Sequence, residues 1–289
     1  MNRLKQNRAA SFVAVTLVYI IATVVGVLTY RALTLDWWLS LLIADVAATV
    51  ATFIFSIIFK NASVYDPYWS VQPPVILVLF AIAFGEPLSA VDVLLLVTVS
   101  LWAVRLTANW AYTFGGLTHQ DWRYTMLCEK TGRAYPFINL LGIHLFPTLV
   151  VYACVLPAVY AIRDGGSIGV LTVLGVILSL LAVLLQLISD IEMQAFRRRG
   201  KGGFIRVGLW RHARHPNYLG EILMWWGVAI TSISVLPGQW YLAAGALANT
   251  LMFMFVSIPM ADRRQARKPG YAEYRAETRH LLPIPRSKK

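Results

Sequence analysis

The stretch IGVLTVLGVILSLLAVLLQLISDI, Ile168 to Ile191, decides the fold class, because it is long and apolar and carries one charged residue, Asp190. A run of roughly 20 apolar residues is long enough to cross the hydrocarbon core of a bilayer as a helix. The chain has eight such runs, at approximately residues 11–31, 37–59, 70–85, 88–111, 137–161, 168–191, 218–236 and 240–259. The sequence therefore predicts an all-α, polytopic membrane bundle of about seven to eight transmembrane helices.

The composition leads to the same class. Of the 289 residues, 58% are hydrophobic and 14% are charged, whereas a soluble domain has about 25% charged residues with which to cover its surface. Lipid must therefore cover much of this chain. The first apolar run is long and lacks a small-residue cleavage site, so no cleavable signal peptide is expected. Cys128 and Cys154 form no CxxC pattern, and we expect neither a disulfide framework nor a metal site.

The net charge of +12 could indicate a nucleic-acid partner, but the placement of the basic residues argues for another cause. If eight spans start from an N-terminus inside the cell, 23 of the 26 Lys and Arg residues fall on the inside. Cytoplasmic segments of membrane proteins carry such an excess. We therefore expect both termini in the cytoplasm, no nucleic-acid partner, and a bacterial inner-membrane protein whose site faces the cytoplasm.

Asp45 is the deepest ionisable residue in a predicted span. Charged residues in the hydrocarbon region are costly and usually turn toward a partner or a cavity. Asp45 could be a proton donor in a substrate cavity. It could equally be a buried hydrogen-bonding residue that fixes helix packing, and Arg105 in the fourth span is the partner that the sequence offers.

A polar and aromatic segment, NASVYDPYWS, starts at Asn61 and precedes the third span. Tyr and Trp at this depth are often interface anchors. A carboxylate beside a phenol can instead donate a proton or polarise a carbonyl, so Tyr65 and Asp66 are catalytic candidates. Tyr124, in the polar segment 112–136, could close a cavity from its loop. The alternative for that segment is an ordinary surface helix.

A second polar segment, GLWRHARHPNYLGE, starts at Gly208 and leads into the seventh span. The sixth helix should end near Arg197–Arg199, where glycines follow, and Pro216 suits the first turn of the next helix. The guanidinium of Arg214 is a donor for phosphate. Hydrogen bonds to ribose hydroxyls or to an amide could come from Asn217, Tyr218 and Glu221. The alternative is a cytoplasmic loop whose arginines contact lipid phosphates. Neither a Rossmann nor a P-loop motif is present.

The segment GLWRHARHPNYLGEILMWWG closely resembles the C-terminal signature of the steroid 5-alpha-reductase and sterol-reductase superfamily, and the chain looks most like its bacterial DUF1295 branch. Further similar segments are DPYWS, LWAVRLTANW, DWRY, SDIEMQAFRRR and KPGYAEYRAETRHLLPIP. In the reductases, this C-terminal region binds NADPH. The resemblance therefore implies a cofactor site formed by Asp190, Arg197, Arg199, Trp210, Arg214, His215, Asn217, Tyr218, Glu221, Asp262, Tyr271 and Tyr274.

The resemblance implies an NADPH-dependent reductase that acts on a C=C bond conjugated to a carbonyl in a lipophilic, membrane-borne substrate. We expect one domain, residues 1–289, in which residues 1–135 form the substrate side and residues 136–289 the cofactor side. The catalytic candidates are then Tyr65, Asp66, Tyr124 and Asp45. The chain lacks the Gln-Glu pair of the steroid enzymes, which argues against a steroid itself, and the expected substrate is a steroid-like or other enone lipid.

Two other functions fit the sequence. Isoprenylcysteine and phospholipid methyltransferases, which use S-adenosylmethionine, share this C-terminal architecture and a related RHPxY turn. The basic residues between 192 and 217 suit a phosphate-rich cofactor better than a cationic sulfonium. A lipid-binding or scaffolding bundle is the non-enzymatic alternative.

Overall fold

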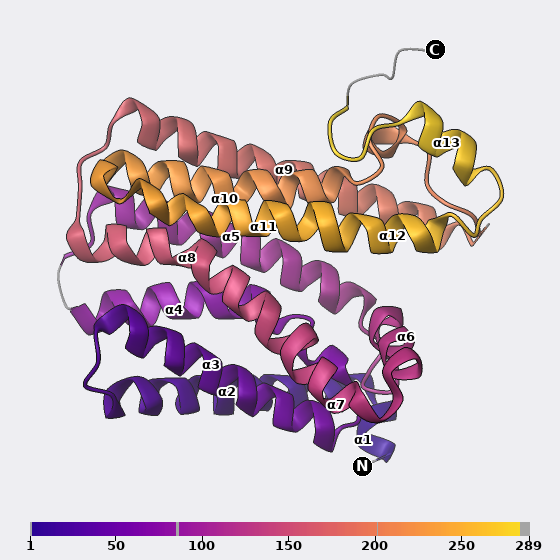
Figure 1. The fold of residues 1–289 in the computed structure, drawn as a ribbon, viewed down its shortest axis with the longest axis horizontal. Coiled ribbons are helices and arrows are strands. Elements are labelled where there is room, and N and C mark those ends of the chain that lie inside the picture. The colour runs from indigo at the N-terminus through magenta and orange to yellow at the C-terminus, as the bar shows by residue number, and fades with distance from the viewer. Residues whose placement is uncertain (1, 85–86, 201, 284–289) are drawn as a thin grey trace. The chain divides into compact units, whose positions relative to one another are not determined.

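Helices of membrane-spanning length dominate the computed structural model, which describes residues 2–84, 87–200 and 202–283 (Figure 1). Among these residues, eight helical stretches are long and apolar enough to cross a membrane: Arg8–Ala32, Trp37–Ile58, Ala62–Phe84, Ala90–Thr113, Trp122–Asp164, Val170–Arg198, Pro216–Val235 and Pro237–Gln265. The described residues contain no strand, and their one isolated β-bridge joins Ala213 to Arg279. The predicted fold class is confirmed. Residue 85, the end of the predicted span 70–85, lies outside the described residues. So do residues 284–285, the end of the segment KPGYAEYRAETRHLLPIP.

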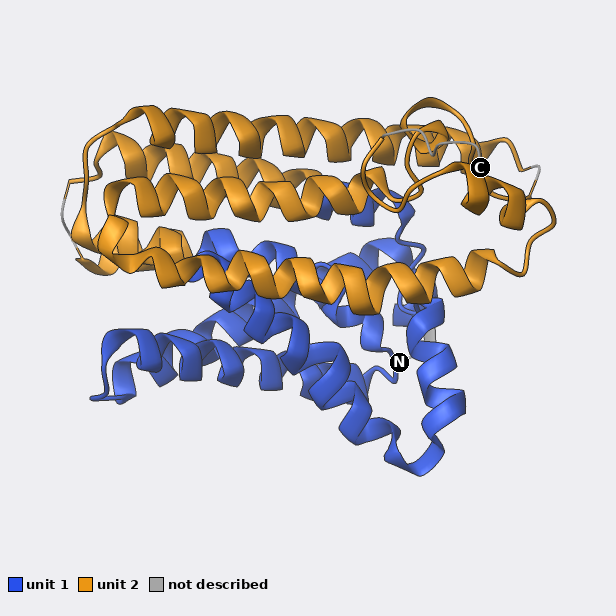
Figure 2. Ribbon diagram, turned by 45° about the horizontal axis from the view of Figure 1, so that its top comes forward, with its two compact units in different colours: residues 1–76, 106–156 blue, residues 77–105, 157–289 orange. Residues whose placement is uncertain are grey.

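The chain divides into two compact units whose boundaries fall inside helices (Figure 2). Unit 1 comprises residues 1–76 and 106–156, and unit 2 comprises residues 77–105 and 157–289. The three helices that contribute to both units are α4 (Tyr68–Phe84), α5 (Ala90–Thr113) and α8 (Phe146–Asp164). The units therefore interleave along the chain, whereas the sequence suggested two consecutive halves.

Unit 1 is built from α1 (Asn2–Gln6), α2 (Arg8–Ala32), α3 (Trp37–Ile58), η1 (Ala62–Tyr65), α6 (Trp122–Thr131), η2 (Gly132–Ala134), α7 (Tyr135–Ile138) and η3 (Asn139–Leu145), with parts of the shared helices. Asn61 fixes the start of η1. Its side-chain amide donates to the carbonyls of Leu117 (2.7 Å) and His119 (3.0 Å), and its Oδ1 accepts from the Ser63 amide (2.8 Å). This caps the short helix that carries Tyr65.

Unit 2 is built from α9 (Val170–Arg198), η4 (Gly208–Arg211), α10 (Pro216–Val235), η5 (Pro237–Ala243), α11 (Ala244–Met252), η6 (Phe253–Ser257), α12 (Ile258–Gln265) and α13 (Tyr271–Glu277). Helices α9 and α10 run side by side (Figure 1). A Cβ on Gly227 would lie 2.6 Å from the Gly175 carbonyl oxygen, so only glycine permits this approach. Small residues bring membrane helices together in this way.

The ends of these two helices agree with the sequence prediction. Helix α9 ends at Arg198, and Gly200 follows with a φ of 63°, a left-handed conformation that favours glycine. Helix α10 begins at Pro216. The tail then returns to this point, since the Arg214 amide donates to the Arg279 carbonyl and the His215 amide to the His280 carbonyl, both at 3.0 Å. The polar turn before α10 is therefore held against the tail.

Candidate functional site

Asp262 on α12 is the centre of a polar cluster in unit 2. We call it the Asp262 cluster and define it as the buried residues Arg214, His215, Asp262 and Tyr271 with the half-exposed His280. Asp262 Oδ1 accepts from Tyr271 Oη at 2.5 Å and from His215 Nε2 at 2.9 Å. Its Oδ2 pairs with the Arg214 guanidinium at 3.1 Å. Asp262 is 5% exposed and Arg214 is 2% exposed. A buried carboxylate with this many donors forms a fixed, fully paired anion.

The Asp262 cluster also holds the C-terminal tail. Arg214 donates to the carbonyls of Thr278 (2.5 Å) and Arg275 (3.3 Å) and to His280 Nδ1 (2.6 Å). Tyr274 Oη donates to the Trp210 carbonyl, and Trp210 Nε1 donates to a carbonyl of α9. Arg214 precedes α10, and its guanidinium binds carbonyl groups of the tail.

The two tail tyrosines act as donors. Burial, together with the hydrogen bond to the Asp262 carboxylate, raises the pKa of Tyr271 well above its ordinary value. Burial raises the pKa of Tyr274 to about 12, although the cations of Arg214 and Arg206 oppose this. Both phenols therefore keep their protons at neutral pH.

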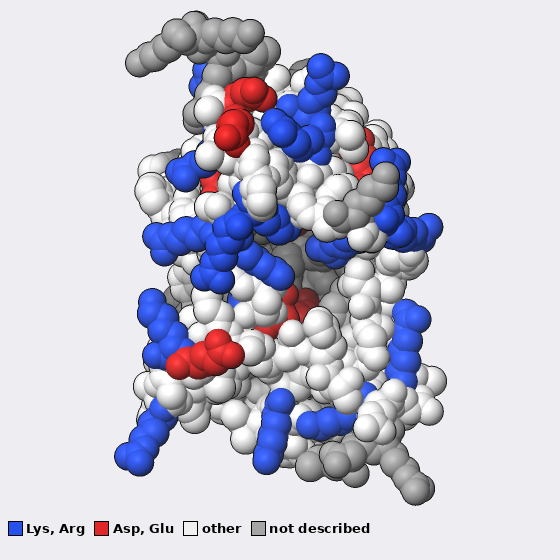
Figure 3. All heavy atoms as spheres, turned by 90° about the vertical axis from the view of Figure 1, so that its right-hand side faces the viewer, with Lys and Arg blue, Asp and Glu red and all other residues white. Residues whose placement is uncertain are grey.

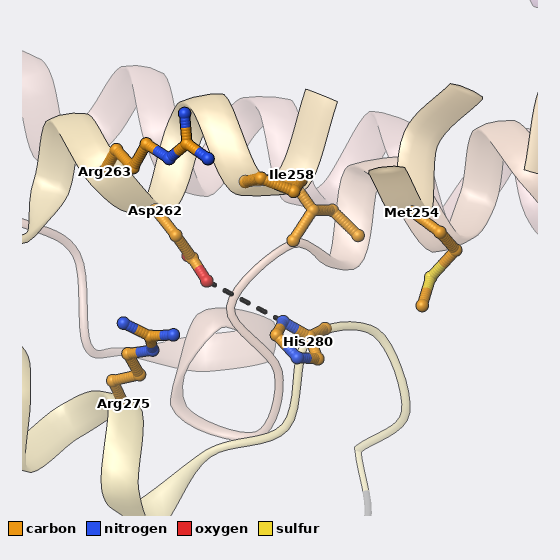
Figure 4. A pocket seen from close by; sticks show the side chains of 7 residues that line it. Met254, Ile258, Asp262, Arg263, Arg275 and His280 are labelled. Carbon is orange, nitrogen blue, oxygen red and sulfur yellow. Dashed lines mark ion pairs between the residues drawn. The ribbon is translucent and has the colours of Figure 1, made fainter. Parts of the chain in front are cut away.

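A cavity of about 310 Å³ lies against the Asp262 cluster (Figure 4). Its lining consists of Met254, Ile258, Pro259, Asp262, Arg263, Arg275 and His280. Two guanidinium groups and an imidazole beside an apolar wall can hold a phosphate and a flat ring. The volume is at the small end of ligand sites, so the cavity can hold part of a dinucleotide. The donor set fits a phosphate-bearing cofactor.

Asn217 and Tyr218 open α10 close to this cluster. The Tyr218 ring stacks on His215, with ring centroids 5.0 Å apart and planes 8° apart. Asn217 Oδ1 is buried, and no described residue donates a hydrogen bond to it. An unpaired buried amide oxygen is uncommon in folded proteins. It is a suitable acceptor for a ligand N–H or hydroxyl.

Glu221, one turn further along α10, is already paired within the protein. Its Oε2 accepts from Trp102 Nε1 at 2.8 Å, its Oε1 from Trp225 Nε1 at 2.9 Å, and Arg105 lies 3.7 Å away. Arg105 also pairs with Asp190 at 3.0 Å. This network accounts for Glu221 and Asp190 without a cofactor, and their predicted cofactor contacts stay predictions.

The partner suggested for Asp45 was wrong. Arg105 pairs with Asp190 and Glu221 and also donates to Gln186, all in unit 2. The sequence offered several carboxylates at span depth and gave no basis for choosing among them. The indole donors of the Glu221 network were missed altogether, since a Trp in an apolar run is indistinguishable from a lipid-facing one.

Arg197 and Arg199 make none of the hydrogen bonds described above. Both side chains are exposed at the end of α9. On the face drawn in Figure 3, Lys and Arg side chains predominate over Asp and Glu side chains. Exposed arginines of this kind suit either a cofactor phosphate or the phosphates of lipid headgroups.

The catalytic candidates form a second cluster, in unit 1. Tyr124 Oη donates to Asp66 Oδ1 at 2.7 Å. Tyr65 bonds Thr148 instead, with 2.8 Å between the two hydroxyl oxygens, and Thr148 in turn lies 3.1 Å from the Thr49 hydroxyl. The phenol beside Asp66 is thus Tyr124, whereas the sequence suggested its neighbour Tyr65. Tyr65 and Asp66 are adjacent in the chain but bond different partners, so their adjacency did not predict a hydrogen bond between them.

Asp45 lies on α3 and is 3% exposed. Gln72 Nε2 donates to its Oδ1, while its Oδ2 is buried and has no hydrogen-bond partner among the described residues. Asp45 is therefore half-paired, which leaves both of its sequence interpretations open. Gln72, Thr148 and the buried His144 were not singled out from the sequence, because lone polar residues in apolar runs carry no motif.

Comparison with known proteins gives a family and no described activity. The chain is 24% identical over 193 residues to the uncharacterized protein C594.04c of Schizosaccharomyces pombe, and the match covers 57% of this chain and 56% of the yeast protein. The chain thus spans little more than half the length of that relative. No solved structure matches. The family model described as "Protein of unknown function (DUF1295)" matches residues 52–278, so the chain belongs to the DUF1295 family, which lies in the steroid 5-alpha-reductase-like group.

Proposed function

We propose that this protein is an NADPH-dependent membrane reductase of a C=C bond conjugated to a carbonyl in a lipophilic substrate. The observation that carries the proposal is the cavity beside the Asp262 cluster, whose lining includes Arg263, Arg275 and His280. Cationic donors around a concave site favour a ligand with several phosphates. Membership of the steroid 5-alpha-reductase-like group supports the same cofactor.

Within this proposal, each residue has a task. Arg263 and Arg275 would bind phosphate, and Asn217 Oδ1 would accept a hydrogen bond from the amide or a ribose hydroxyl. The Asp262 cluster would position the tail that carries Arg275 and His280. Arg197 and Arg199 would raise the local concentration of an anionic cofactor by electrostatic attraction. We place this site on the cytoplasmic side of a bacterial inner membrane, where reduced nucleotides are available.

The chemistry that NADPH supplies when bound is a hydride for the β-carbon of the conjugated bond. The electron pair of that bond then moves toward the carbonyl oxygen, which an acidic group must stabilise, and a proton completes the α-carbon. Tyr65 can donate a hydrogen bond to such an oxygen while it accepts one from Thr148, whereas Tyr124 would have to turn its single hydrogen from Asp66 to that oxygen. Asp66 orients Tyr124 by accepting its proton in a hydrogen bond, and Asp45 is the deeper candidate for the proton source.

The test is thermal unfolding of the detergent-purified protein with NADPH, NADH or S-adenosylmethionine. A ligand that binds only the folded state at about 100 times its Kd adds about 2.7 kcal/mol to stability. We expect stabilisation by NADPH, less by NADH, and loss of NADPH absorbance when a lipophilic enone is added. Stabilisation by S-adenosylmethionine in place of NADPH would make the protein a methyltransferase. Stabilisation by none of the three would favour the scaffolding alternative.

A further inference from the structure

His144 is a fully buried histidine in unit 1 with one unused nitrogen. It lies in η3, a π-helical turn, and its side chain is 0% exposed. Its Nδ1 lies 2.9 Å from the Asn139 carbonyl oxygen. Since a carbonyl can only accept, Nδ1 carries the hydrogen, and Nε2 of the neutral ring is an acceptor. Within residues 2–84, 87–200 and 202–283, no donor reaches Nε2.

A second unpaired acceptor lies on the same π-helical turn. The Asn139 side-chain amide donates to Ser56 Oγ at 3.3 Å, and the Ser56 hydroxyl itself donates to the Phe53 carbonyl at 2.7 Å. That arrangement fixes the amide orientation, so the atom left over is Asn139 Oδ1. It is buried, and it too lacks a donor among the described residues. What this turn lacks is a hydrogen-bond donor.

The surroundings of His144 are mostly apolar and aromatic. The Tyr65 ring centroid lies 4.7 Å from that of His144, and the Phe53 ring centroid 5.5 Å. Ile143 beside it is also buried. Leaving acceptors unpaired in such surroundings is unfavourable. A π-helical turn is also less favourable than a regular α-helical one, and such turns frequently occur at functional sites.

We propose that His144 Nε2 accepts a hydrogen bond from a hydroxyl group of a lipophilic ligand that enters unit 1 from the membrane. Tyr65, already bonded to Thr148, lies against the same ring and would border the ligand. The proposal concerns binding, and it rests on the reductase function only in that the ligand would then be the substrate of that reaction. It adds that this substrate carries a hydroxyl group as well as a conjugated carbonyl.

The test uses two isomeric probes, 1-octanol and heptyl methyl ether, which differ in that only the alcohol donates a hydrogen bond. The protein is purified in an amine-oxide detergent that lacks hydroxyl groups, without NADPH. Binding is measured by titration of the tryptophan fluorescence, and the histidine nitrogens are observed by ¹⁵N NMR. We expect a roughly fivefold preference for the alcohol. We also expect the alcohol alone to shift the Nε2 signal of His144.

His144→Phe should abolish the preference, and His119→Phe, at an exposed histidine of the same unit, should keep it. If His144→Phe fails to fold, the proposal is tested on the unaltered protein alone, by its relative affinity for the two probes and by the Nε2 signal of His144. Equal binding of the two isomers would overturn the proposal. An Nε2 signal that already reports a hydrogen bond and that neither probe moves would also overturn it, because water would then satisfy the nitrogen. Failure of NADPH to bind would leave these results unchanged.

Discussion

The two polar clusters differ in how completely their atoms are paired. In unit 2, both carboxylate oxygens of Asp262 accept from charged or phenolic donors, and the surrounding groups hold the tail. In unit 1, Asp45, Asn139 and His144 each have a buried atom without a partner among the described residues. A complete network fixes a shape, whereas an incomplete one leaves acceptor atoms that a ligand or a water molecule can satisfy. We therefore assign the Asp262 cluster to positioning the tail, and the unpaired atoms of Asp45, Asn139 and His144 to ligand contact.

The largest expected effect is at the complete network. Asp262→Asn should lower the free energy of unfolding by about 3–5 kcal/mol, because Arg214 would remain buried without its counter-charge. Chemical unfolding in detergent measures this loss. The control is Glu277→Gln, since Glu277 is 71% exposed and pairs with exposed Arg206, and the free energy of unfolding should stay within about 0.5 kcal/mol of the unaltered protein. A loss below about 1 kcal/mol for Asp262→Asn would show that the cluster does not hold the tail.

Glu221→Gln tests whether Glu221 belongs to the fold or to the cofactor site. The NH₂ group of Gln is a donor and would face one of the two indole N–H donors, so that neither could form the hydrogen bond. Arg105 would keep the carboxylate of Asp190 but lose that of Glu221. We expect a loss of about 2–3 kcal/mol in unfolding free energy. Exposed Glu273→Gln is the matched control. Unchanged stability with weakened NADPH binding would move Glu221 from the fold to the cofactor site.

Features that depend on neighbouring residues could be predicted from the sequence, whereas contacts between distant residues could not. The spans came from hydropathy alone, and the α9 and α10 ends came from Gly200 and Pro216, because chain-breaking residues act locally. The family resemblance placed Arg214 and Asp262 in one cofactor site, but their ion pair was not predicted, because 47 residues lie between them in the chain and no local rule joins them. The role of His144 could not be predicted from the sequence. Its place in a π-helical turn follows from no local sequence pattern, and the lack of a partner for Nε2 depends on residues brought together by the fold.

Arg263→Gln tests the cavity beside the Asp262 cluster. Loss of one charged hydrogen bond to phosphate costs about 1.5 kcal/mol, which corresponds to a roughly tenfold rise in the Kd for NADPH. Unfolding free energy should barely change, because Arg263 is exposed. Arg267→Gln is the control, an exposed arginine outside the cavity lining. Equal NADPH affinity in both variants would place the phosphates elsewhere, with Arg197 and Arg199 as the next positions to change.

Two tyrosine variants can be compared in unit 1, where their effect on stability is expected to be small. Tyr124→Phe removes the hydrogen bond from Tyr124 Oη to Asp66 Oδ1 and should cost about 1 kcal/mol. Tyr65→Phe should cost less, since Thr148 keeps its bond to Thr49 at 3.1 Å. If these phenols serve the reaction, enone turnover should fall far more than stability does, by roughly 100-fold or more for the one that donates to the carbonyl. Turnover that falls only as much as stability in both variants would remove the tyrosines from the reaction and leave Asp45 as the candidate.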